Sequence, residues 1–132
     1  MEIYVEDQAK AVKWHDLIFG FHLLKELEFW SANSGPVFIG NKDGNIKIAL
    51  FKGNRENDGS IGRITFRTSG KEFISFLNRL ETVPVFSLGQ KIDKHNVVDH
   101  DISFSIYFND PDGNKLELTS YDHEYLHSKF DQ

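Results

Sequence analysis

Hydrophobic and polar positions alternate in short segments along the chain, and the first segments predict a strand followed by a helix. Residues 3–5 form a short apolar run typical of a strand. Asp7 has the side chain of a helix N-cap, and apolar residues at helical spacing then predict a helix over residues 8–19. Gly20 ends this helix at the position where a positive φ is required.

Three strand-like stretches follow the helix and end in a polar linker. They cover residues 22–30, 36–40 and 45–51. Asp43 and Gly44 lie between the last two stretches, and this dipeptide predicts a tight hairpin turn. Residues 53–60 are all polar or glycine, so we expect a linker there.

The same order of elements then occurs a second time. Residues 61–68 predict a strand, and Ser69 is the expected N-cap of a helix that extends to residue 81. Three further strands are predicted at residues 85–92, 102–108 and 115–120. The turn at residues 109–114 places proline and glycine as a tight turn requires. The repeated order predicts two βαβββ modules in an α+β fold.

The length of 132 residues suits one domain built from these two modules. We place its boundaries in the least structured stretches of the pattern. These boundaries define module one as residues 1–53, a linker as residues 54–60, module two as residues 61–122 and a C-terminal tail as residues 123–132.

Charge and composition exclude several classes of function. The chain has 15 Lys and Arg against 20 Asp and Glu, a formal net charge of −5, and no basic cluster, so nucleic-acid binding is not expected. The absence of cysteine excludes disulfides, thiolate catalysis and cysteine-ligated metal sites. The start MEIYVEDQ has no signal-peptide pattern, and no apolar run is long enough for a membrane span. We therefore expect a cytoplasmic protein with no membrane partner.

The end of the second module, SIYFNDPDGNKLELTSYD (residues 105–122), resembles the closing hairpin of one large superfamily. This is the glyoxalase/bleomycin-resistance/extradiol-dioxygenase superfamily, also called the vicinal oxygen chelate (VOC) proteins. Residues 5–21 are similar to its opening strand and helix, and residues 63–66 to the strand that opens its second module. The resemblance implies two tandem βαβββ modules that form a curled mixed sheet around a concave cavity, with the helices on the outer face.

Many members of this superfamily hold a divalent metal that polarises two vicinal oxygens of a substrate. The resemblance places ligands on the first strand of each module and on the final strand, where Glu117 matches. The second module has Arg63 where metal-binding members have His, the first-strand position would precede Met1, and residues 47–50 offer no carboxylate. Because one ligand does not hold a transition metal tightly, we expect no cofactor, with a divalent metal as the alternative.

Strand alternation gathers the candidate ligand-binding residues of the second module on one face. The resemblance adds Tyr4 on the first strand and His100 in the loop before the seventh strand. The full set of candidates is Glu117, Arg63, Tyr107, Ser105, Thr65, Arg67, Tyr4 and His100.

More than one interpretation of these candidates stays open. We expect Glu117 to pair with Arg63 in an empty pocket rather than to ligate a metal. Arg63 and Arg67 form either a clamp for a carboxylate or phosphate or a solvated strand face. Tyr107 either faces the pocket or is a half-exposed strand tyrosine. His100 either reaches a ligand from its loop or is simply solvated.

Two histidine patterns are expected outside this face. His15 is predicted on the first helix as a hydrogen-bonded or surface histidine. Residues 123–127 (His-Glu-Tyr-Leu-His) match the zincin motif H-E-x-x-H, but no third ligand follows. We expect a terminal helix that packs Tyr125, Leu126 and Phe130, with adventitious zinc or nickel binding as the alternative.

The resemblance and the missing ligands together predict a protein that binds a small molecule in its cavity without a tightly held metal, as the bleomycin-resistance branch does. One alternative is a metal-dependent enzyme, a glyoxalase-like lyase, an isomerase or a dioxygenase, that acts on a vicinal-oxygen substrate. Another is a non-catalytic structural dimer. Analogy with the superfamily also predicts a homodimer.

Overall fold

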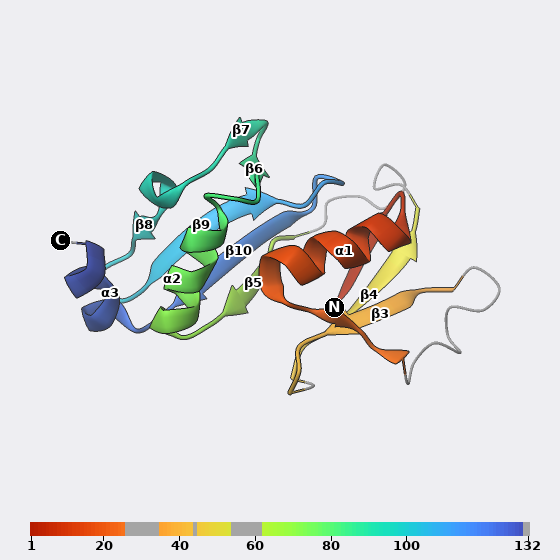
Figure 1. Cartoon of the computed structure of the whole chain (residues 1–132), viewed down its shortest axis with the longest axis horizontal. Helices are drawn as coiled ribbons and strands as arrows, with labels where there is room; N and C mark the ends of the chain where they lie inside the picture. The colour runs from red at the N-terminus through yellow and green to blue at the C-terminus, as the bar shows by residue number, and fades with distance from the viewer. Residues whose placement is uncertain (26–34, 44, 54–61, 131–132) are drawn as a thin grey trace. The chain divides into compact units, whose positions relative to one another are not determined.

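The chain forms two compact units, Met1–Ile61 and Gly62–Gln132 (Figure 1). A computed structural model describes residues 1–25, 35–43, 45–53 and 62–130. The longest helix in these ranges has 12 residues, and none of the described helices has the length and apolarity that a membrane crossing demands. Each unit has its own sheet and its own helix, so the two are described separately.

The first unit is a βαβββ module with a four-stranded sheet. Its strands have the order β1-β4-β3-β2, in which β1 runs parallel to β4 and the other neighbours are antiparallel. The elements are β1 (Glu2–Val5), α1 (Gln8–Phe19), β2 (His22–Leu23), β3 (Val37–Gly40) and β4 (Lys47–Lys52).

Local signals set both ends of α1. The Asp7 carboxylate accepts a hydrogen bond from the Lys10 N–H at 3.0 Å, which satisfies one of the free donors of the first turn. At the other end Gly20 has φ of 73°, and its N–H donates to the Asp16 carbonyl at 2.8 Å. The predicted helix over residues 8–19 is confirmed.

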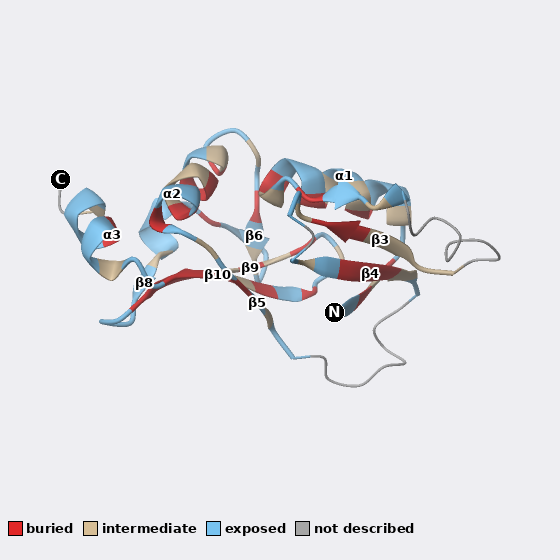
Figure 2. Cartoon of the chain, turned by 90° about the horizontal axis from the view of Figure 1, so that it is seen from below, coloured by how far each residue is buried: buried red, intermediate tan, exposed pale blue. Residues whose placement is uncertain are grey.

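The core of the first unit lies between α1 and the sheet (Figure 2). Ile3, Ile39 and Leu50 are fully buried on neighbouring strands, and Ile18 is fully buried on the helix. Of the predicted strand 22–30, the structure gives His22–Leu23 as strand β2, whereas residues 26–34 lie outside the described residues. The predicted Asp43-Gly44 turn also involves a position outside them, Gly44.

The second unit repeats the βαβββ order and adds short elements between its helix and its last two strands. Its main path is β5-β10-β9-β6-β7, and β8 also pairs with β9. The elements are β5 (Ile64–Arg67), α2 (Gly70–Arg79), β6 (Phe86–Ser87), β7 (Gln90–Lys91), the 3₁₀-helix η3 (Lys94–Asn96), β8 (Val98–Asp99), β9 (Phe104–Asn109), β10 (Lys115–Ser120) and α3 (His123–Phe130).

Aromatic residues of α2 fill the core of the second unit. Ser69 caps the helix by accepting the Glu72 N–H at 3.2 Å. Phe73 and Phe76 are buried, and the Phe76 ring lies 5.2 Å from that of Phe108 on β9. Leu118 on β10 is buried on the same side, so α2 covers one face of this sheet. The predicted α+β class with two βαβββ modules is confirmed.

The predicted strand over residues 85–92 is wrong, because this segment is a hairpin of β6 and β7. Leu88 has φ of 51° and Gly89 φ of 80°, so the chain turns back after two residues. The Leu88 N–H donates to the Asn109 side-chain oxygen at 2.9 Å, which ties the turn to β9. A leucine rarely adopts a positive φ, and the sequence therefore did not indicate the turn.

Candidate functional site

The face of the second sheet that lies away from α2 is lined by polar side chains from β5, β10 and β9. The register places Glu117 opposite both Thr65 and Tyr107. It also places Thr119 opposite Arg67 and Ser105. We call this surface the polar face. It consists of Arg63, Thr65, Arg67, Lys115, Glu117, Tyr107 and Asn109, and Thr119 and Ser105 share this side of the strands but are buried.

Arg63, Tyr107 and His100 form a connected group at one end of the polar face. The Arg63 guanidinium carbon lies 4.7 Å from the centroid of the Tyr107 ring, which is a cation–π contact. The Tyr107 hydroxyl and the His100 Nε2 are 2.9 Å apart and share a hydrogen bond. The structure thus brings together three of the predicted site residues from two strands and a loop.

Glu117 lies beside this group but does not pair with Arg63. Its Oε1 accepts a hydrogen bond from the Thr65 hydroxyl at 3.1 Å. The ion pairs among the described residues contain neither Arg63 nor Glu117. The predicted Arg63–Glu117 ion pair is therefore wrong. The reason is the register, which sets Thr65 directly opposite Glu117, whereas the Arg63 side chain extends over the Tyr107 ring.

Arg67 has a similar environment at the other end of β5. Its guanidinium carbon lies 4.4 Å from the centroid of the Tyr121 ring, and Tyr121 follows directly after β10. Sequence reasoning missed Tyr121, although alternation from Glu117 and Thr119 places residue 121 on the same face. Both arginines of the polar face therefore rest on tyrosine rings.

Ser105 lies below the surface rather than on it. It is 1% exposed, and its hydroxyl donates to the Thr119 hydroxyl at 2.9 Å. The Thr119 hydroxyl in turn donates to the Phe104 carbonyl at 3.2 Å. This chain of bonds holds β9 and β10 together beneath the exposed arginines.

Tyr4 belongs to the first unit, where it lies on β1. It is half-buried, and its ring centroid is 5.6 Å from that of Phe51 on β4. The structure therefore places seven of the eight predicted site residues in the second unit, and Tyr4 in the first.

The architecture matches solved structures at low sequence identity. An integron cassette protein from the mobile metagenome of the Halifax Harbour sewage outfall has a TM-score of 0.65 and 18% identity over 91% of this chain and 94% of its own. The fosfomycin resistance protein FosX from Listeria monocytogenes, complexed with Mn(II) and sulfate ion, has a TM-score of 0.61 and 17% identity over 98% and 93%. TioX from Micromonospora sp. ML1 has a TM-score of 0.64 and 15% identity over 92% and 95%.

These similarities decide the fold. The chain has the VOC fold. Comparison with protein-family models gives no match, and comparison with curated proteins gives none either. The structural likeness thus confirms the resemblance that the sequence motifs indicated, at the level of the fold.

The polar face does not supply the donor set by which a VOC protein holds a divalent metal. Glu117 is its one carboxylate and accepts the Thr65 hydroxyl, while His100 Nε2 is bonded to Tyr107. The guanidinium of Arg63 lies on the same group and would repel a cation. In the ranges that the structure describes, no three His, Cys, Asp or Glu side chains are grouped so that they could bind a metal ion.

The H-E-x-x-H segment forms α3, whose first histidine is engaged elsewhere. His123 Nε2 lies 2.7 Å from Asp99 Oδ1, and its ring stacks on Phe104 with centroids 4.6 Å apart. The bond from His123 lowers the pKa of Asp99, and the Asp101 N–H contributes in the same direction. Leu126 is fully buried, as expected for a packed terminal helix, whereas Tyr125 is exposed.

The environment of His15 differs from the predicted one, which was that of a hydrogen-bonded or surface histidine. It is fully buried, and neither ring nitrogen has a hydrogen-bond partner in the described part of the chain. Its ring lies among aromatic side chains, with the Trp14 centroid at 4.9 Å and the Phe19 centroid at 6.0 Å. Burial lowers the pKa of His15 from 6.5 to about 4, because the charged imidazolium is not solvated there.

Proposed function

We propose that this protein binds a small molecule bearing a carboxylate, phosphate or phosphonate group on the polar face, without a tightly held metal ion. The observation that supports this most is the state of Arg63 and Arg67. Both guanidiniums lie on tyrosine rings, and neither is ion-paired within the described part of the chain.

A guanidinium that rests on an aromatic ring keeps its hydrogen-bond donors available. The ring contacts the flat side of the guanidinium, whereas the N–H groups point outward in its plane. Two of these N–H groups match the oxygens of a carboxylate or phosphate and form a bidentate, charge-assisted pair. The tyrosine rings of Tyr107 and Tyr121 therefore hold Arg63 and Arg67 ready for an anion.

The charge of the polar face also favours an anionic ligand. Arg63, Arg67 and Lys115 contribute three positive charges against the single carboxylate of Glu117. The chain as a whole has a net charge of −5, so this face is locally opposite in sign to the rest. Such a contrast steers anions toward the face and raises their association rate.

Hydrogen-bonded polar groups beside the arginines provide a basis for selectivity. The His100–Tyr107 pair and the Thr65–Glu117 pair present donors and acceptors whose partners are fixed at 2.9 and 3.1 Å. A ligand hydroxyl or carbonyl that replaces one of these bonds would be preferred over an analogue without it.

A metal-dependent VOC enzyme is the second candidate, and one comparison favours it. The FosX structure with TM-score 0.61 is a complex with Mn(II). In this alternative Glu117 would be a metal ligand, and the protein would act as a lyase, isomerase or dioxygenase on a vicinal-oxygen substrate. A non-catalytic homodimer is the remaining alternative.

Melting curves with small anions separate these candidates. We expect phenylphosphonate, benzoate or phosphate to raise the melting temperature in the presence of EDTA, and benzylamine to have no effect. A ligand at ten times its Kd stabilises the folded state by about 1.4 kcal/mol, which is a shift of a few degrees. The shift should fall to about a third in Arg63→Gln, whose affinity is lowered, and persist in full in Lys71→Gln, which removes an exposed lysine on α2.

Other outcomes of the same curves contradict the proposal. Stabilisation by Mn²⁺, Ni²⁺ or Zn²⁺ that is lost in Glu117→Ala would support the metal-dependent enzyme. A protein that responds to neither anions nor metals, and has a dimeric mass in light scattering, would support the structural dimer.

A further inference from the structure

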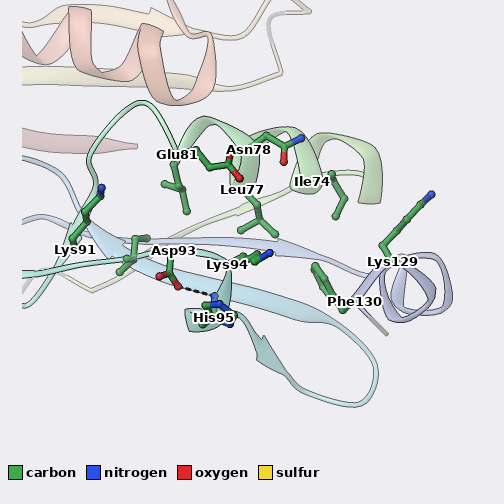
Figure 3. A pocket seen from close by; sticks show the side chains of 12 residues that line it. Ile74, Leu77, Asn78, Glu81, Lys91, Asp93, Lys94, His95, Lys129 and Phe130 are labelled. Atoms are coloured by element: carbon green, nitrogen blue, oxygen red, sulfur yellow. Dashed lines mark hydrogen bonds between the residues drawn. The ribbon is translucent and has the colours of Figure 1, made fainter. Parts of the chain in front are cut away.

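A pocket lies on the side of the second sheet opposite the polar face, where α2, the segment from β7 to η3, and α3 meet (Figure 3). Its volume is about 470 Å³, within the range of small-molecule sites. Because α2 covers the sheet face that lies away from Arg63, this pocket is distinct from the polar face. It is lined by Ile74, Leu77, Asn78, Leu80, Glu81, Lys91, Ile92, Asp93, Lys94, His95, Lys129 and Phe130.

The floor of this pocket is apolar. Leu77 on α2, Leu80 directly after α2 and Ile92 after β7 are buried beneath it, and each belongs to the core of the second unit. Ile74 and Phe130 are partly exposed at its walls. An apolar ligand body that covered these side chains would gain about 25 cal/mol for each Å² removed from water.

The rim of the pocket carries more available cations than available anions. Lys91 and Lys94 have no ion-pair partner among the residues that the structure describes. Lys129 lies with its ammonium 5.4 Å from the Tyr125 ring centroid. Asp93 uses a carboxylate oxygen to accept the His95 N–H at 2.8 Å, so it caps η3 rather than pairing with a lysine.

The lysines lie on the rim of the pocket, at the edge of its apolar floor. Figure 3 shows Lys94 between Leu77 and the η3 segment, with Lys91 and Lys129 at opposite ends of the pocket. Glu81, in the turn after α2, is the remaining carboxylate of the rim. A cationic ligand would meet three lysines here, whereas a carboxylate would find two ammonium groups with free donors.

We propose that this pocket binds an amphipathic monocarboxylate, with its apolar chain on Leu77, Ile92 and Phe130 and its carboxylate at Lys94. The Lys94 ammonium offers three donors to the carboxylate oxygens. The pocket and the polar face lie on different sides of the sheet, and so the two sites take their ligands independently.

An NMR titration with decanoate below its micelle concentration tests this site. Saturable shifts are expected in the amide signals of α2, residues 91–95 and residues 129–130. Lys94→Gln should weaken decanoate binding roughly three- to tenfold, because one charge-assisted hydrogen bond is lost at a partly exposed site. Decanol should bind to the wild type more weakly than decanoate does. Its affinity should be the same for the wild type and for Lys94→Gln. Lys71→Gln is the matched control and should bind decanoate like the wild type.

Several results would overturn this assignment. They are an absence of saturable shifts, shifts that are confined to the polar face, or equal affinity of this pocket for decanoate in Lys94→Gln and the wild type. Tighter binding of decyltrimethylammonium than of decanoate would also contradict it, since the rim would then select cations. Arg63→Gln should leave the decanoate shifts of α2, residues 91–95 and residues 129–130 unchanged, which separates this site from the proposed anion site.

Discussion

Acidification should destabilise this protein through His15. The imidazole is fully buried among aromatic rings, and neither nitrogen is hydrogen-bonded to any residue that the structure describes. Its folded-state pKa is about 4, against 6.5 for the free side chain. Below pH 6.5 the unfolded chain binds a proton at His15, whereas the folded chain does not do so until about pH 4. Stability is therefore fully present above pH 6.5 and is lost as the pH falls toward 4.

The size of this effect follows from the two pKa values. Each pH unit between them is worth about 1.4 kcal/mol, so the full loss is about 3 kcal/mol. At pH 5, most of the unfolded chains and few of the folded ones carry the proton, and the loss is about 2 kcal/mol. A folded domain typically has a free energy of unfolding of roughly 5–15 kcal/mol, so this loss is a substantial part of it.

Urea unfolding at pH 8 and pH 5 measures this loss. The free energy of unfolding should fall by about 2 kcal/mol more in the wild type than in His15→Phe or His15→Leu, since neither apolar residue titrates. Two variants are used because the larger ring could strain the packing. His22→Gln is the matched control, an exposed histidine 3.6 Å from Asp16, and should behave like the wild type. An equal pH dependence in the wild type and both His15 variants would refute the reasoning.

Three further predictions concern stability. Asp110→Ala should lower the free energy of unfolding by about 1–3 kcal/mol in urea, because the buried Asp110 carboxylate accepts hydrogen bonds from the closing turn. Gly70→Ala should lower the melting temperature, since a Cβ there would lie 2.5 Å from Tyr125 Cδ2. The decrease should be smaller when Tyr125 is also replaced by alanine, and an equal decrease would show that the two side chains do not clash. Glu117→Ala should cost no more than about 1.5 kcal/mol in urea, because it removes one hydrogen bond at a partly exposed site.

Elements with local signals at both ends could be predicted from the sequence. Asp7 caps α1 and Gly20 ends it in the left-handed region, and both depend only on neighbouring residues. The strand over residues 115–120 was predicted for the same reason, because the turn at 109–114 precedes it. The β6–β7 hairpin was missed because its turn depends on Leu88, a residue type that does not indicate a positive φ.

The contacts of the candidate site depend on register, which the sequence does not specify by itself. Alternation correctly placed Arg63, Thr65 and Glu117 on one face. The partner of Glu117 required the pairing of β5 with β10, which sets it opposite Thr65. His15 was misjudged because its helical position does not show that aromatic rings enclose both ring nitrogens.

Calorimetric titration of phenylphosphonate in EDTA tests the proposed anion site most directly. We expect saturable one-to-one binding to the wild type and an affinity roughly tenfold lower in Arg63→Gln, since charge-assisted hydrogen bonds are lost. Lys71→Gln should bind like the wild type. Equal affinity in Arg63→Gln, or binding that requires added Mn²⁺ and disappears in Glu117→Ala, would contradict the central claim.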